Sequence, residues 1–330
     1  MTQSPSIRRP FAGAFAGLAA LCATPALHAG SDFPSRPVRI IVGFPPGGAT
    51  DFVARSIAPR LGEALKQQVV IDNRAGANGT IAAELASNAT PDGYNLHLGT
   101  LGALVISPAI SKVGYDPQRD LLPISLAVKL QNIFIAHPGV AAKTVTDLIA
   151  LAKQKPGTIN YASSGLGSPG HLAGELLKAM TKIDLQHVPY RGGAPALGDL
   201  VSGQVPIFVA VISTGVPVIN SGRAIALAVT GAKRSPALPE VPTVAETPAL
   251  KGYEASNWYG LMAPAATPRP IIDRLHRDMV SVMDTPVLRD LLAARGVDAT
   301  SSTPDEFAAY IRSETAKWGK VIRAANLTPN

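Results

Sequence analysis

The stretch Ile40-Ile41-Val42-Gly43-Phe44-Pro45-Pro46-Gly47-Gly48-Ala49-Thr50-Asp51 is the most informative part of this sequence. Its apolar start predicts a buried strand, and the prolines and glycines after it predict a loop. The loop leads into a helical pattern over residues 52–61. A glycine loop at a helix N-terminus presents unpaired backbone N–H groups at the positive end of the helix dipole. The stretch therefore predicts a cradle for an anion.

The chemistry of this loop narrows the kind of anion. Gly43 and Gly48 have the spacing of a phosphate-binding P-loop, but Ala49, followed by Thr50, stands where the P-loop has its lysine. The loop thus suits an anion that is held by amides, such as a carboxylate, better than a triphosphate. The alternative is a tight strand-to-helix turn that binds nothing.

Residues 1–29 have the features of a cleaved signal peptide. Arg8 and Arg9 form a basic start, residues 11–27 form an apolar core, and small residues at 26–29 offer a cleavage site. A membrane anchor is the alternative, but the apolar run is short for a membrane span. We therefore expect an exported, periplasmic protein.

The composition argues against several classes of protein. Export removes the single cysteine, Cys22, so disulfides, thiol catalysis and thiolate metal sites are not expected. The formal charge of +7 falls to about +5 when Arg8 and Arg9 leave, because residues 1–29 contain no acid. Aromatic residues are 5% of the chain and do not alternate with basic ones, as nucleic-acid platforms require. We expect an anionic small molecule as partner, with no nucleic acid, metal or cofactor.

Short apolar runs alternate with helical patterns along the mature chain, which predicts an α/β fold with parallel strands. Strands are expected at residues 38–42, 69–72, 95–99, 133–137, 159–161, 186–188, 207–211, 224–229 and 259–263. Helices are expected at residues 52–66, 80–87, 146–153, 171–180, 195–202, 270–282, 287–294 and 304–323.

The order of these segments predicts two lobes, each a mostly parallel sheet flanked by helices. Residues 30–135 and 258–330 are assigned to lobe 1, and residues 136–257 to lobe 2. A long strand at 126–138 leaves lobe 1 and a strand at 258–264 returns to it, so two crossing strands form a hinge. The three C-terminal helices have no predicted strands between them and are expected to cover lobe 1. A ligand would bind in the cleft, at the carboxyl ends of both sheets.

A second glycine loop lies in lobe 2, at residues 160–170, and opens the helix that starts at His171. Its glycines match the dinucleotide-binding fingerprint, and Asp184 follows at about the expected distance. Asp184 begins its predicted strand instead of ending it, however, and a nicotinamide cofactor is unexpected in an exported chain. We therefore interpret this loop as a second amide-lined helix N-terminus. Its hydroxyl groups belong to Ser163, Ser164 and Ser168.

The two loops would face each other across the cleft and hold an anion from both sides. Arg191 follows the strand after the second loop and offers a bidentate partner for a carboxylate. The alternative for Arg191 is a solvated surface arginine.

Nucleophilic catalysis finds little support in the sequence. No Gly-x-Ser-x-Gly elbow is present. A triad of Ser164 with His171 or His187 and Asp199 is conceivable, but no spacing singles it out.

At this point the chain resembles a known family, the periplasmic solute receptors of the tripartite tricarboxylate transporter system, or Bug-type receptors. The resemblance extends over essentially the whole mature chain. It is carried by residues 44–51, 72–79, 91–94, 160–175, 188–192, 226–230, 238–243 and 258–261.

The resemblance implies a two-lobed clamshell of the type II periplasmic-binding-protein class. Such a protein is a monomer that captures a small organic acid, delivers it to membrane transporter subunits and catalyses no reaction. Asp51 is interpreted as orienting loop amides or a water. The ligand-binding residues expected on this basis are Phe44, Gly47, Gly48, Ala49, Thr50, Asp51, Thr100, Ser163, Ser164, Gly167, Ser168, Arg191 and Ala210.

One segment departs from the family pattern. Family members usually carry an aspartate after the position of Val205 and a second one where the following apolar run closes, but residues 206–213 contain neither acid. If those acids help to hold an ammonium group, this chain should prefer a plain carboxylate to an amino acid. Two other functions stay open: a secreted serine-dependent hydrolase, and a ligand sensor that reports to a membrane signalling protein.

Overall fold

The computed structural model describes residues 1–2 and 33–324, so nearly all of the predicted signal peptide lies outside the described residues. The strands are β1 (Val38–Val42), β2 (Val69–Asn73), β3 (Asn95–Thr100), β4 (Leu121–Ala136), β5 (Asn160–Ser163), β6 (Gln186–Pro189), β7 (Ile207–Val211), β8 (Ile225–Val229), β9 (Ser256–Pro264) and β10 (Val297–Ala299). The α-helices are α1 (Ala49–Leu65), α2 (Thr80–Ser87), α3 (Ser107–Ile110), α4 (Val145–Gln154), α5 (Pro169–Thr181), α6 (Gly193–Val201), α7 (Ile212–Asn220), α8 (Arg269–Met283), α9 (Pro286–Ala293) and α10 (Pro304–Ala324). Short helical turns are η1 (Ala77–Gly79), η2 (Gly102–Ile106), η3 (Val244–Glu246) and η4 (Pro248–Leu250).

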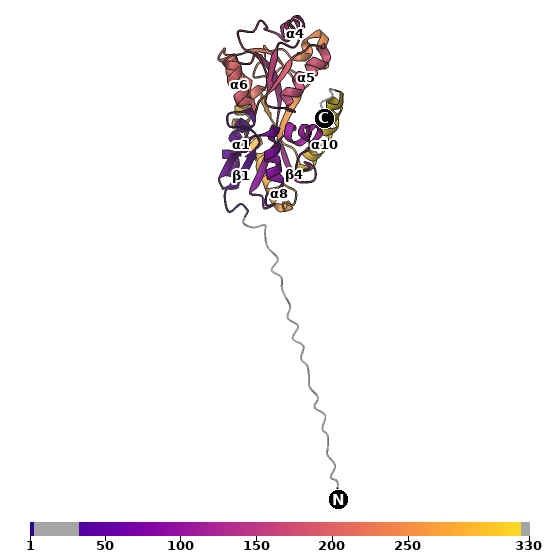
Figure 1. Ribbon diagram of the computed structural model, residues 1–330. Coiled ribbons are helices and arrows are strands. Elements are labelled where there is room, and N and C mark those ends of the chain that lie inside the picture. Colours follow the sequence, from indigo (N-terminus) through magenta and orange to yellow (C-terminus); the bar gives the residue numbers. More distant parts are fainter. Residues whose placement is uncertain (3–32, 325–330) are drawn as a thin grey trace.

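The strands join in the order β2-β1-β3-β9-β4-β7-β5-β6, and β8 and β10 pair with β4 in addition. At one end β1 runs parallel to β2 and β3, and at the other end β5 runs parallel to β6 and β7. The connecting strands β4 and β9 run antiparallel to their neighbours. Figure 1 shows two parts, one above the other, with α4, α5 and α6 in the upper part and α1 and α8 in the lower. Two α/β lobes joined by crossing strands are therefore confirmed, whereas the exact lobe boundaries stay a prediction.

The long strand β4 serves both lobes. Leu121–Gln131 pairs with β9, and Asn132–Ala136 pairs with β7. At the change of partner, the backbone N–H and C=O of Asn132 bond to the hydroxyl and N–H of Thr230, both at 2.9 Å. The same hydroxyl lies 2.8 Å from the carbonyl oxygen of Ala255. Three buried chain segments are thus tied together where β4 changes from one sheet partner to the other.

The C-terminal helices cover the lower lobe, as expected from the sequence. α8 and α9 pack on α1, while α10 packs on β4. Ile272, Leu275 and Met279 of α8 share one buried cluster with Val53 and Ile57 of α1. The expectation that no strand separates these helices is wrong, because β10 lies between α9 and α10 and pairs with β4. A three-residue strand is too short to show a period in the sequence.

α7 is a second element that the sequence reasoning missed. Gly215 and Pro217 lie inside it, and both residues are typical of loops and turns. The helix forms nevertheless because its first five residues are buried, and it packs on β4, β7 and β8.

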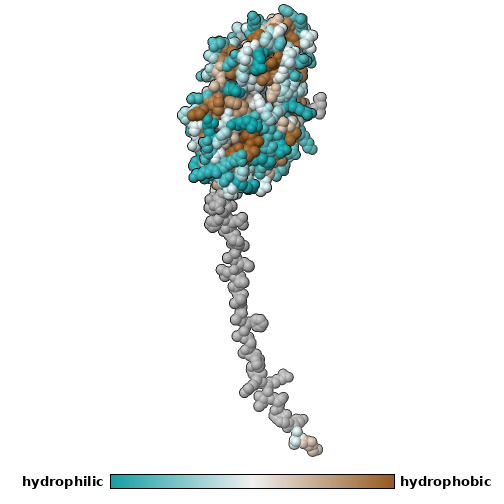
Figure 2. Space-filling view, turned by 90° about the vertical axis from the view of Figure 1, so that its left-hand side faces the viewer, coloured by the Kyte–Doolittle hydropathy of each residue, from teal (hydrophilic) through white to brown (hydrophobic). Residues whose placement is uncertain are grey.

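On the face seen in Figure 2, hydrophobic residues gather in several separate patches with hydrophilic side chains between them. Over the described part of the chain, no helix combines the length and apolarity that a bilayer crossing requires.

Candidate functional site

A cavity of about 30 Å³ lies where the loops of the two lobes meet. Its lining residues are Phe44, Gly48, Ala49, Thr50, Thr100, Ser164, Pro169, Gly193, Phe208, Val211, Thr214, Asn257 and Tyr259. The residues among these that the sequence analysis singled out are Phe44, Gly48, Ala49, Thr50, Thr100 and Ser164. Residues from both predicted glycine loops thus meet at one small space.

Four helices begin at this cavity. Gly48 is the N-cap of α1, Pro169 is the first residue of α5, Gly193 is the first residue of α6, and Val211 is the N-cap of α7. The first N–H groups of a helix have no partner inside the helix, and the helix dipole makes this end positive. Four positive ends around one cavity favour an anion there. Sequence reasoning assigned the starts of α1 and α5 to the site. It predicted α6 as a helix at residues 195–202 without placing its start at the site, although the Gly192-Gly193 pair after β6 is a similar signal, and it missed α7.

Neutral side chains add hydrogen-bond donors to the same space. Burial raises the pKa of Tyr259 to about 12, and the hydrogen bonds with Thr50 and Asn257, which lower this pKa, offset burial only in part. The phenol therefore keeps its proton. The Asn257 Oδ1 atom accepts from the Trp258 N–H at 2.8 Å, so its amide nitrogen is the atom that donates toward Tyr259. The Thr100 hydroxyl oxygen accepts from the Ala103 N–H at 3.3 Å and can still donate its hydrogen.

None of the described residues that line the cavity carries a charged side chain or an imidazole. An anion there would be stabilised by backbone N–H groups, helix dipoles and hydroxyls, without an ion pair. A cation would find no carboxylate and would meet the positive ends of the helices. The cavity therefore selects for negative charge.

Asp51 hydrogen-bonds to the backbone of the first loop and does not line the cavity. Its carboxylate accepts from the Gly47 N–H at 3.0 Å, the Arg55 Nε at 2.9 Å and the Asn73 Nδ2 at 3.0 Å. Burial pushes the pKa of Asp51 up, but these hydrogen bonds outweigh burial and hold the pKa below its usual value. Gly47 has a φ of 84°, a left-handed conformation that favours glycine. Asp51 and Gly47 thus shape the loop, in the orienting role expected for Asp51.

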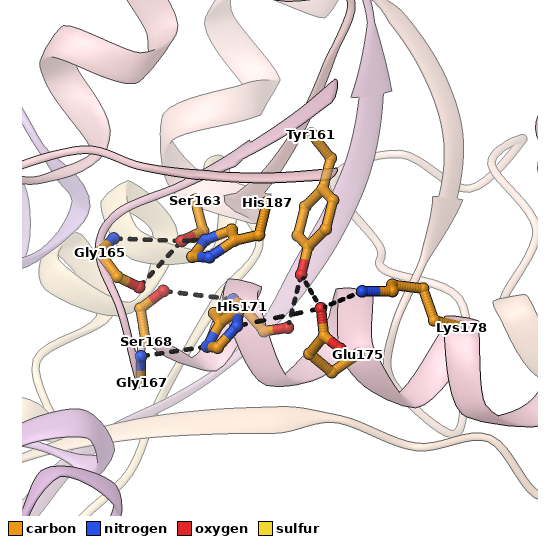
Figure 3. A network of polar contacts seen from close by, with 9 residues as sticks. All are labelled: Tyr161, Ser163, Gly165, Gly167, Ser168, His171, Glu175, Lys178 and His187. Carbon is orange, nitrogen blue, oxygen red and sulfur yellow. Dashed lines mark hydrogen bonds and ion pairs between the residues drawn. The ribbon is translucent and has the colours of Figure 1, made fainter. Parts of the chain in front are cut away.

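A network of hydrogen bonds holds the second loop in its conformation (Figure 3). The Ser168 hydroxyl caps α5 by accepting from the His171 N–H at 3.2 Å, and the Gly167 N–H donates to the His171 Nδ1 at 3.1 Å. The Ser163 hydroxyl accepts from the Gly165 N–H at 3.2 Å and donates to its carbonyl oxygen at 2.9 Å. These residues hold the loop in place, and neighbouring Ser164 is the serine that lines the cavity.

The same network contains a serine–histidine contact, which bears on the hydrolase alternative. The Ser163 Oγ lies 2.7 Å from the His187 Nε2 (Figure 3). Ser163 is fully buried, however, and burial lowers the pKa of His187 to about 3, which makes it a poor base at neutral pH. Asp199, the acid of the conceivable triad, instead accepts from the Tyr190 hydroxyl at 2.6 Å. The arrangement supports the loop and does not assemble a nucleophile for a ligand.

Of the predicted residues, Gly47, Asp51, Ser163, Gly167 and Ser168 support the two loops without lining the cavity, and Arg191 and Ala210 do neither. Arg191 lines a neighbouring groove of about 500 Å³. Ala210 is completely buried and pairs with Ile133 of β4, whereas Phe208 and Val211 of the same strand line the cavity.

Comparison with known proteins settles the family. A family model described as "Tripartite tricarboxylate transporter family receptor" matches residues 53–327. The chain belongs to this receptor family. The resemblance inferred from the sequence is thereby confirmed.

Relatives and solved structures agree with this assignment. The receptor is 34% identical over 296 residues to Protein BugT of Bordetella pertussis, which spans 88% of this chain and 90% of BugT. It matches a structure of R. palustris Rpa4515 with adipate at 36% identity and a TM-score of 0.88, over 91% of this chain and 100% of the other. It also matches MatC of Rhodopseudomonas palustris with bound malate at 32% identity and a TM-score of 0.83, over 88% and 100% of the two chains. The family and these structural neighbours are ligand-binding receptors.

Proposed function

We propose that this receptor captures a small organic carboxylate between its lobes and delivers it to the membrane subunits of a tripartite tricarboxylate-type transporter. The observation that carries the proposal is the cavity at which four helices begin and which has no charged side chain among its described lining residues. The adipate and malate bound by Rpa4515 and MatC, both carboxylates, support the same class of ligand.

The proposal includes where and how the receptor works. It acts in the periplasm, as its family does, after removal of residues 1–29, and it acts as a monomer without enzymatic activity. The proposed lack of enzymatic activity is supported by the cavity, whose described lining includes no histidine or carboxylate that could serve as a general base.

A plain carboxylate is expected to bind more tightly than the amino acid of matching length. Phe208 and Val211 form an apolar wall, and a buried ammonium group without a carboxylate partner costs several kcal/mol. We expect succinate to bind at least roughly tenfold more tightly than aspartate, and an aromatic acid more tightly than its amino analogue. Thermal shift with the mature receptor gives a first ranking, because a bound ligand stabilises by mass action, and calorimetry gives the affinities.

Two results would contradict these expectations. If no organic acid binds, the proposed function is wrong. If the amino acid binds more tightly in each pair, the class of ligand is wrong and the ammonium has a partner outside the apolar wall, with Asp51 as the first residue to test.

Binding is also expected to close the two lobes. Contacts across the cleft include the hydrogen bond that the Asn78 Nδ2 donates to the Gly167 carbonyl oxygen at 2.8 Å and the packing of Gly192 directly against Pro45. Two lobes joined by crossing strands are free to move relative to each other, and a ligand that contacts both lobes favours the closed arrangement. Small-angle scattering should therefore give a smaller radius of gyration with ligand than without it. An identical radius in both states would argue for a rigid pocket.

A further inference from the structure

The cavity is too small for a whole ligand. A single water needs about 10–15 Å³ of such space, so about 30 Å³ holds little more than one carboxylate group. Phe44 and Ser164 line both this cavity and the groove of about 500 Å³ beside it. The rest of a ligand whose carboxylate lies in the cavity would therefore extend past these two side chains into the groove.

The groove is formed by both lobes and carries a positive side chain from each. Lys112 comes from the segment after α3 and Arg191 from the segment after β6. Both are exposed, and within residues 33–324 neither forms an ion pair. Glu84 of α2 also lines the groove and is not within ion-pair distance of either cation. Two cations against one acid leave the described groove lining net positive.

The floor of the groove is polar as well. Asn78 is 8% exposed, and its Nδ2 donates to Ser107 and Gly167. Its Oδ1 atom is buried and has no hydrogen-bond partner among the described residues. A buried acceptor without a donor is unfavourable, so this position suits a water or a ligand group that donates a hydrogen bond. An ionised dicarboxylate has no hydrogen to donate, so a water would have to fill this position when such a ligand is bound.

We propose that the groove is a second anion subsite, which receives the far carboxylate of an elongated dicarboxylate between Lys112 and Arg191. This inference rests on the proposed function, since it assumes that the near carboxylate lies in the cavity. Charge-assisted bonds from opposite lobes to one carboxylate would also link ligand length to lobe closure. Ligands with one carboxylate would lack this link.

The test is calorimetry on the mature receptor with length-matched pairs: adipate against hexanoate, and succinate against butyrate. At least one dicarboxylate is expected to bind roughly tenfold more tightly than its monocarboxylate partner, and this preference should shrink as salt is raised. Arg191→Gln and Lys112→Gln should each weaken the preferred dicarboxylate severalfold and change the monocarboxylate affinity less than about twofold. Glu84→Gln should act in the opposite direction and strengthen dicarboxylate binding.

Lys251→Gln is the matched control, because Lys251 is exposed and lines neither the cavity nor the groove. It removes the same charge and should leave both affinities unchanged. Equal binding of the two members of each pair, or an equal loss for both ligands in the Arg191 and Lys112 variants, would overturn the subsite while the proposed carboxylate receptor stands. Failure of all four acids to bind would overturn the proposed function and the subsite together.

Discussion

Gly48→Asp is expected to abolish carboxylate binding while the protein stays folded. Gly48 lines the cavity and caps α1, so a carboxylate attached there would lie among the N–H groups that the ligand needs. Two carboxylates in one small buried space repel strongly, and we expect the affinity for succinate or adipate to fall roughly 100-fold or more.

The fold should tolerate this change for two reasons. Gly48 has a φ of −84°, which other residues adopt without strain. A side-chain carbon added there would lie 3.7 Å from the Pro45 carbonyl oxygen, an ordinary contact distance. Aspartate is also a favourable residue at the N-cap of a helix.

Calorimetry measures the loss of binding, and urea unfolding checks the fold. Gly48→Asn is the control, because asparagine has nearly the same shape without the charge. Gly48→Asn should retain considerably more affinity than Gly48→Asp. An unchanged affinity of the aspartate variant would remove the first loop from the ligand site.

The second large effect concerns pH: the receptor should lose stability as the pH falls below about 6.5. Burial lowers the pKa of His97 and of His171 to about 4, and the pKa of His187 to about 3. The rings of His171 and His187 are stacked with their centres 3.9 Å apart, so two charges there would repel each other (Figure 3). The Gly167 N–H also donates to the His171 Nδ1, which must be unprotonated to accept it.

The sign of the effect follows from linkage. An unfolded histidine takes up its proton near pH 6.5, whereas these three resist protonation in the fold. Their stabilising contribution is complete above pH 6.5 and is lost as the pH falls from there toward 4. Within this window each histidine lowers the free energy of unfolding by about 1.4 kcal/mol per pH unit. The three histidines together therefore lower it by about 4 kcal/mol between pH 7.5 and 5.5. Asp51, whose pKa is lowered, adds to acid sensitivity only at lower pH.

Urea unfolding at pH 7.5, 6.5 and 5.5 measures this prediction. His171→Asn keeps an acceptor in place of the ring and removes one titrating group. The variant should therefore lose about a third of the pH dependence, whatever its stability at pH 7.5. A free energy of unfolding that does not change between pH 7.5 and 5.5 would mean that the buried rings titrate alike in the folded and unfolded chain.

Local sequence patterns determined much of this receptor. The strand, glycine loop and helix at residues 38–65, and again at 160–181, were predictable because a short apolar run, a glycine cluster and a helical period are all properties of neighbouring residues. The α/β class followed from the same patterns, and the family was identified by the resemblance of specific motifs, such as residues 44–51 and 160–175. Asp51 as a loop-orienting residue was also predictable, because an acid beside an anion cradle needs another role.

The tertiary structure alone decided which side chains reach the cavity. Tyr259 enters it because β9 pairs with β3 so that Tyr259 lies opposite Thr100, more than 150 residues earlier in the chain. Thr214 enters it because α7 forms despite its glycine and proline. Adjacent serines on one loop also have different roles, since Ser163 turns back to His187 and Ser164 lines the cavity. Register across strands and burial between lobes depend on residues far apart in sequence, and no local pattern records them.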